Sequence, residues 1–214
     1  MRIKDTSKEQ SILNAAVHVF AKDGFSKAKM HTIADTAGIA AGTIYLYFKN
    51  KESILLKIFD QTWSQIYEKI QSIQTNQSIK FEEKLYRILE TLTAYFTENQ
   101  NLALVFANEE NLAIQRYRSF TKYHEKTMRV IDALAIQGMS EGALAPGLSP
   151  VFFSAFVFGG MRFWLNRWAL DPVQYPLKLI GSDIPRILRC GNTQGSFTHP
   201  HPIPASPSSP KDMP

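Results

Sequence analysis

Apolar residues recur at helical spacing along most of the chain. The first stripe, Ile12, Ala16, Val19 and Phe20, stops before Gly24. Similar stripes predict helices over residues 51–72, 85–96, 102–106, 111–137 and 150–170, and a last helical stretch over 173–190 that Pro185 interrupts or kinks. No segment alternates apolar and polar residues as a half-buried strand would. The pattern therefore predicts an all-α protein.

Short polar or turn-forming segments separate the predicted helices. They lie at residues 72–78, 99–101, 142–147 and 171–172. The uncharged run over residues 142–161 is long enough to raise the question of a membrane span. Prolines and a glycine interrupt its first half, and the remainder is too short to cross a bilayer before Arg162. We therefore expect no transmembrane helix.

The segment over residues 29–48 combines two short helices with a glycine turn. Gly38 follows the end of the first helix, where glycine takes the left-handed conformation at low cost. A second helix is predicted over residues 41–47, with Ile44 facing inward, and Asn50 can cap the helix that follows. A helix, a tight turn and a second helix form the unit that places its second helix in the major groove of DNA.

The same stretch resembles the signature of the tetracycline-repressor-type (TetR) regulators. Residues 33–52 match the pattern I-A-x-x-A-G-[IV]-x-x-G-T-[IL]-Y-x-Y-F-x-N-K-E, and residues 20–25 are similar to the end of the family's first helix. The resemblance implies an N-terminal three-helix DNA-binding head, residues 6–66, whose helix-turn-helix spans about residues 29–48. It also implies a larger ligand-binding and dimerisation domain, residues 67–190, and a homodimer that binds a palindromic operator.

The resemblance also implies which residues approach DNA. The expected contacts in and after the second helix are Ala40, Ala41, Gly42, Thr43, Tyr45, Tyr47 and Lys51. Ala40 and Ala41 offer only methyl groups, so Thr43 and Tyr45 are the positions expected to set base preference. Lys51 is expected to donate to a phosphate.

At the start of the first helix the chain departs from the family. Members often hold a phosphate there with Thr or Ser, and this chain has Ala28 and Lys29. We expect Lys29, His31 or Thr32 to substitute. His31 can equally be an ordinary exposed histidine.

The charge distribution agrees with one DNA-binding end. The 214-residue chain has a net charge of +5, and residues 1–51 contribute eight cations and four acids. Nearly all the excess positive charge therefore lies in the predicted head, which suits phosphate contact.

The resemblance also implies that the larger domain binds a small apolar effector whose binding releases the DNA. The candidate lining residues are Phe96, Phe106, Tyr117, Phe120, Tyr123, Phe156 and Trp164. Aromatic residues at helical spacing are more often plain core. Because dimers of the family pair their last two helices, the resemblance also implies that some of residues 152–168 serve the dimer.

A closer resemblance within the family points to one effector. The pattern of residues 42–52, followed by residues 101–105 and 158–168, is similar to fatty-acid-degradation repressors released by long-chain acyl-coenzyme A. Arg116, Arg118 and Lys122 can meet its phosphates or can simply face water.

Other classes of protein fit the sequence less well. The histidines His18, His31 and His124 lie in separate elements without a catalytic motif, so we expect no enzyme, cofactor or metal site. A helical interaction protein that does not bind DNA, or an activator of the same fold, stays open. The single cysteine, Cys190, fits a reducing cytoplasm. Residues 191–214 hold six of the 11 prolines and are predicted to be a disordered tail, in which His199 and His201 could bind a metal only weakly.

Overall fold

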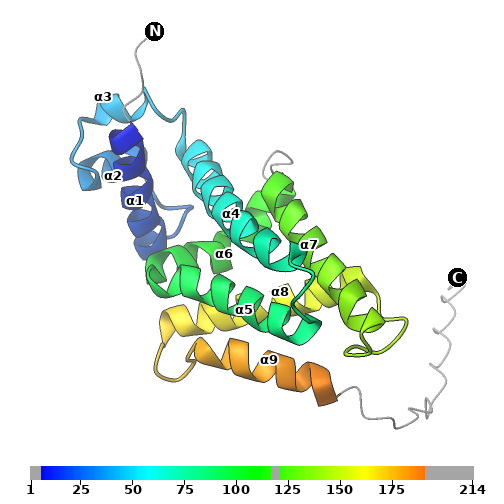
Figure 1. Ribbon diagram of the computed structural model, residues 1–214. Helices are drawn as coiled ribbons and strands as arrows, with labels where there is room; N and C mark the ends of the chain where they lie inside the picture. Colours follow the sequence, from blue (N-terminus) through cyan, green and yellow to red (C-terminus); the bar gives the residue numbers. More distant parts are fainter. Residues whose placement is uncertain (1–5, 117–120, 191–214) are drawn as a thin grey trace, which may run out of the picture.

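A computed structural model describes residues 6–116 and 121–190, and every element in these ranges is an α-helix (Figure 1). The helices are α1 (Thr6–Asp23), α2 (Met30–Thr36), α3 (Ala41–Ile44), α4 (Lys51–Thr75), α5 (Phe81–Thr97), α6 (Gln100–Arg116), α7 (Thr121–Ser140), α8 (Pro150–Leu170) and α9 (Lys178–Cys190). The predicted fold class is confirmed.

Two predicted boundaries are wrong. The separate helices expected over residues 102–106 and 111–137 are instead α6, which continues to Arg116, and α7. The sequence between residues 106 and 111 contains good helix formers and no Gly or Pro, so nothing stops the helix there. The helix expected over residues 41–47 is regular only as far as Ile44. The N–H groups of Tyr47 and Phe48 then both donate to the Ile44 carbonyl, at 3.0 and 2.9 Å, in a tight turn.

The head consists of α1, α2, α3 and the first turns of α4. Its core contains side chains with no exposed surface from all four helices: Ile12, Ala16, Ile33, Ala34, Ile44 and Ile54. Burying a side chain of the size of isoleucine contributes about 1.5–3 kcal/mol, so these contacts hold α3 in place within the head.

The body is built around α4, which leaves the head and packs against α5 and α7 (Figure 1). α9 packs on α5, and α8 packs against α6 and α7. α6 also contacts α1 and so joins the body to the head. Because α4 is continuous from Lys51 to Thr75, the expected boundary at residues 66–67 lies inside a helix. The two-domain division stays a prediction.

A polar network closes the end of the body away from the head. Lys84 is 2% exposed, and its Nζ donates to the Gln74 carbonyl and, at 2.9 Å, to Oε1 of Gln137. Glu141 accepts hydrogen bonds from Nε2 of Gln137 and from the N–H of Phe81, which lower the pKa of its carboxyl group. The end of α4 and the start of α5 are thus tied to the end of α7.

No helix in the described residues is long and apolar enough to cross a membrane. Three sets of predictions lie outside the described residues: Tyr117, Arg118 and Phe120, the side chain of Arg116, and the tail over residues 191–214.

Candidate DNA interface and effector site

The turn between α2 and α3 has the predicted glycine geometry. Gly38 has a φ of +68°, a conformation that favours glycine, and a Cβ there would meet no atom within 4 Å. Its conformation, rather than lack of space, therefore requires glycine. The N–H of Ile39 donates to the Ala34 carbonyl at 3.0 Å and closes the turn. The buried Ile44 and Phe48 then hold α3 against the head.

The opposite side of α3 faces solvent. Ala40, Ala41 and Gly42 are exposed at its start, and a Cβ on Gly42 would meet nothing within 4 Å. Tyr45 is 58% exposed just after the helix, and Thr43 and Tyr47 are half-buried. These residues form one accessible surface that can approach base edges and phosphates.

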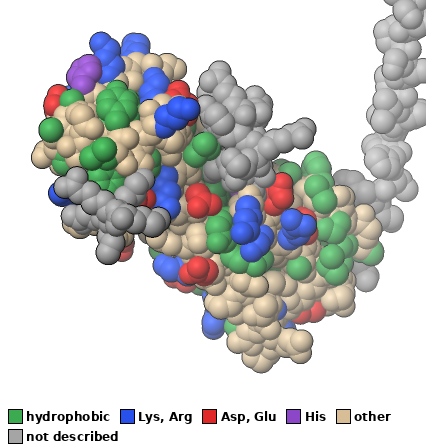
Figure 2. All heavy atoms as spheres, turned by 90° about the horizontal axis from the view of Figure 1, so that it is seen from above, with side chains coloured by type: hydrophobic (Ala, Val, Ile, Leu, Met, Phe, Trp, Pro, Cys, Tyr) green, Lys and Arg blue, Asp and Glu red, His purple; other side chains and the backbone are tan. Residues whose placement is uncertain are grey.

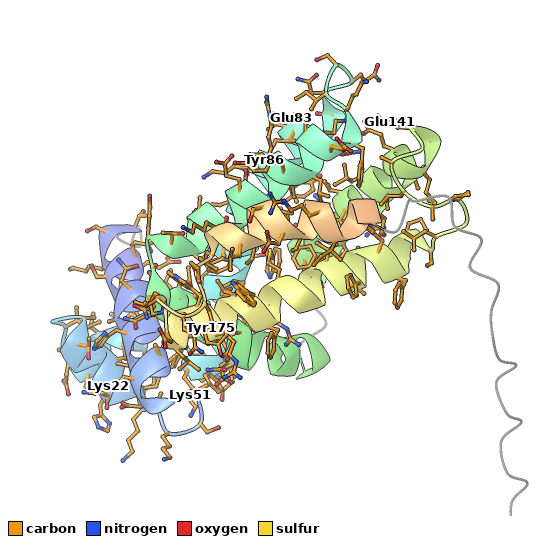
Figure 3. All side chains as sticks on the ribbon, turned by 90° about the horizontal axis from the view of Figure 1, so that it is seen from below. Lys22, Lys51, Glu83, Tyr86, Glu141 and Tyr175 are labelled. Carbon is orange, nitrogen blue, oxygen red and sulfur yellow. The ribbon has the colours of Figure 1, made fainter. Side chains whose placement is uncertain are left out.

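Cations surround this surface. Lys22, Lys27, Lys29 and Lys49 are exposed, as is His31 in the first turn of α2. Figure 2 shows Lys and Arg side chains around the outside of the head. In Figure 3 Lys22 and Lys51 lie at the head end of the molecule, far from Glu83 and Glu141. This end can therefore attract a phosphate backbone.

The three residues expected to hold a phosphate at the start of α2 differ in exposure. Ala28 is buried and offers no hydroxyl. Lys29 precedes α2 in an extended conformation, and its side chain makes no capping hydrogen bond. Thr32 is half-buried. Lys29 and His31 are therefore the more accessible of the three candidates.

The side chain of Lys51 is used inside the head. Its Nζ donates to the carbonyls of Phe25 and Ser26, each at 2.8 Å, and of Ala28 at 3.2 Å. The ammonium group also lies 4.9 Å from the centroid of the Phe25 ring. An ammonium has three donors, so a phosphate contact through this side chain would break one of these bonds. We therefore expect Lys51 to brace the α1–α2 loop, and the phosphate contact expected from the family resemblance is untested.

The start of α4 is capped as predicted. Oδ1 of Asn50 accepts from the N–H of Ser53 at 2.9 Å, and Oγ of Ser53 lies 3.3 Å from the N–H of Asn50. This reciprocal pair fixes the helix start beside α3.

Two of the predicted effector residues lie inside the body. Phe96 and Phe106 are buried, with ring centroids 5.3 Å apart. Phe106 also contacts Phe59 at 4.6 Å and Trp63 at 6.1 Å. The rings form an aromatic cluster between α4, α5 and α6.

Phe156 and Trp164 are elsewhere, which corrects the prediction that they share a site with Phe106. Phe156 is 57% exposed on the outer side of α8. Trp164 is half-buried, and its Nε1 donates to the Pro176 carbonyl at 3.2 Å. Both line a groove between α8 and α9 that is open to solvent. The sequence could not separate the two faces, because α8 is apolar nearly all round.

Two segments of the chain match descriptions of known protein families. Residues 12–58 match "Bacterial regulatory proteins, tetR family", and residues 78–169 match "Tetracyclin repressor-like, C-terminal domain". The chain belongs to the TetR family. It is therefore a DNA-binding transcriptional regulator and not an enzyme.

Individual TetR relatives cover nearly the whole chain. The fatty acid metabolism regulator protein of Bacillus subtilis is 28% identical over 188 residues, which are 86% of this chain and 95% of the relative. The structure of the fatty acid degradation regulator FadR of Bacillus halodurans is 27% identical, with a TM-score of 0.76 over 88% of this chain and 97% of that one. The structure of FadR from Bacillus subtilis in complex with stearoyl-CoA is 26% identical, with a TM-score of 0.72 over 85% and 98% of the two chains.

Three further residues inside the body were not among the predicted effector residues. Trp63 and His124 pack edge to face at 5.2 Å across α4 and α7, and burial lowers the pKa of the His124 ring. Thr127, one turn further along α7, is fully buried. A histidine and a threonine on the apolar stripe of a helix were the available signal. Tyr123, which was predicted, is half-buried next to Tyr67.

Proposed function

We propose that this chain is a homodimeric repressor that binds a palindromic operator and is released by long-chain acyl-CoA. The observation that carries the effector class is the similarity, over 85% of this chain, to a regulator whose structure contains stearoyl-CoA. The head supplies the DNA contacts through α3 and the surrounding lysines, with Thr43 and Tyr45 as the positions that set base preference. Such a protein works in the cytoplasm, next to the chromosome.

The dimer would form through the outer side of α8. Phe152, Phe156 and Phe163 are between 57% and 65% exposed on one side of this helix. Between them, a Cβ on Gly159 or Gly160 would meet nothing within 4 Å, so another helix can approach closely. A second copy of the chain is the occupant that these features favour, because a two-fold operator needs two heads and TetR regulators pair through their last two helices.

The effector would act by changing the separation of the two heads. The protein has one conformation that fits DNA well and another that fits it poorly. A ligand can release DNA only if it binds the second conformation more tightly than the first. The aromatic cluster of Phe59, Trp63, Phe96 and Phe106 is apolar enough for an acyl chain.

The proposal is tested by adding acyl-CoA of several chain lengths to protein bound to an operator selected from random duplexes. Release by long chains and not by coenzyme A alone is the expected result. Failure of every chain length would leave a TetR regulator with a different effector. A selection that returns no two-fold sequence would contradict the palindromic operator.

A further inference from the structure

The hydroxyl group of Thr127 is buried without a hydrogen-bond partner. Within the described residues, three buried side-chain atoms lack a partner: Thr127 Oγ1, Gln74 Oε1 and Asp132 Oδ1. Gln74 and Asp132 are only partly buried, whereas Thr127 has no exposed surface. Burying a hydroxyl without a hydrogen bond lowers the stability of the folded protein, so its presence needs an explanation.

Threonines elsewhere in the helices show that a partner is available locally. The hydroxyls of five of them donate to the carbonyl four residues earlier: Thr36, Thr75, Thr91, Thr93 and Thr97. A threonine in a helix can always make this bond by choosing one rotamer. Thr127 does not make it, although it is the most buried of the six.

One turn of α7 before Thr127, a histidine packs into a group of aromatic rings. His124 lies three residues earlier on the same side of α7, and its ring packs against Trp63. Trp63 also lies 5.7 Å from Phe158 and 6.1 Å from Phe106. An unused hydroxyl one helical turn from such rings fits the composition of a ligand site, in which few polar groups fix the orientation of an apolar molecule.

Toward the surface, two lysines of α7 lie beside a pair of tyrosine rings from α4 and α7. Tyr67 lies four residues after Trp63 on α4, and Tyr123 lies four residues before Thr127 on α7. Their ring centroids are 6.0 Å apart. Nζ of Lys126 lies 5.2 Å from the first ring and 5.3 Å from the second, and Nζ of Lys122 lies 5.7 Å from the Tyr123 ring. A molecule with an apolar end inside and an anionic end outside fits this gradient.

We propose that the Thr127 hydroxyl donates a hydrogen bond to the thioester carbonyl of a bound acyl-CoA. The carbonyl is the first polar atom after the acyl chain and can only accept, which matches the free donor of the threonine. The chain then lies among Trp63, Phe106 and Phe158, and the phosphates lie near Lys122 and Lys126. This proposal rests on acyl-CoA being the effector.

The test pairs a change in the protein with a change in the ligand. Stearoyl-CoA is compared with S-octadecyl-CoA, a thioether that has CH₂ in place of the carbonyl, on the full chain and on Thr127→Val and Thr127→Ser. The unaltered protein and Thr127→Ser should bind stearoyl-CoA about tenfold more tightly than the thioether. Thr127→Val should bind both ligands equally, because it has the same shape and no hydroxyl.

Without ligand, Thr127→Val should unfold at the same or a higher temperature, since it removes an unpaired polar group. Equal binding of the two ligands by the unaltered protein would overturn the carbonyl contact while acyl-CoA stays the effector. An equal loss of affinity for both ligands in Thr127→Val would overturn it as well. Binding of neither ligand by the unaltered protein would overturn both the effector and the contact.

Discussion

Asn101 of α6 meets His18 of α1 across the junction of body and head, with its Nδ2 3.4 Å from Nδ1 of the ring. One residue earlier, Nε2 of Gln100 donates to the Ala169 carbonyl of α8 at 2.6 Å. The first turn of α6 is therefore attached to the head on one side and to α8 on the other. A shift of α6 would move the head relative to the surface through which the dimer is proposed to form.

Removing this attachment should weaken the communication between effector and DNA. In Asn101→Ala, the factor by which stearoyl-CoA weakens operator binding should fall by several-fold, within the range of about 0.5–2 kcal/mol seen for coupling residues. The affinity for stearoyl-CoA without DNA should not change. The measurement is operator affinity with and without saturating ligand.

Asn108→Ala is the matched control, because Oδ1 of Asn108 accepts from Asn166 of α8 and not from the head. It should leave operator affinity in the absence of ligand unchanged. Equal coupling in Asn101→Ala and in the unaltered protein would remove the contact with His18 from the mechanism.

Lys51→Ala should lower the stability of the head. It leaves three carbonyls without their charged donor, which costs about 1–3 kcal/mol. Lys49→Ala, at an exposed neighbour, should change stability by no more than about 0.5 kcal/mol. Thermal unfolding of the two variants makes the comparison.

The salt dependence of operator binding separates bracing from phosphate contact. Loss of one phosphate contact reduces the salt slope by about 0.9, and we expect this for Lys49→Ala. Lys51→Ala should leave the slope unchanged when measured below its unfolding temperature. A reduced slope in Lys51→Ala would restore the phosphate contact expected from the family resemblance.

Sequence and structure give Lys51 different roles, and this difference shows which features could be predicted from the sequence and which could not. Gly38 and Asn50 act on residues within a few positions, so their roles were predictable from local rules. The partners of Lys51 lie 23–26 residues away and are set by how α1 and α4 pack. The effector site predicted for Phe156 differs from its place in the structure for a related reason. Only packing decides which side of an apolar helix faces outward.

The proposed dimer can be tested on α8 directly. Phe156→Asp places a charge on the apolar surface and should give a monomer at micromolar concentration, seen by light scattering. Leu46→Asp is the control, because Leu46 is 65% exposed but lies on the head. It should remain a dimer while losing operator affinity. A dimeric Phe156→Asp protein would require a different interface.

Burial of His124 predicts a pH dependence of stability. Burial lowers the pKa of the ring in the folded protein, whereas the unfolded chain takes up a proton near pH 6.5. Below that pH the unfolded state binds more protons, so stability should fall as the pH falls, by at most about 1.4 kcal/mol per pH unit. His124→Phe should reduce this slope in urea unfolding between pH 7 and 5. His31→Asn, at an exposed histidine, should retain it.

The proposed release of DNA by the effector is tested most directly by asking whether operator and effector weaken each other's binding equally. Stearoyl-CoA is titrated by calorimetry into the free protein and into the protein saturated with its operator. If the ligand releases DNA by favouring the conformation that binds DNA poorly, operator must weaken stearoyl-CoA binding by the same factor, about 5- to 150-fold for typical couplings. Equal affinity for stearoyl-CoA with and without operator would contradict the account.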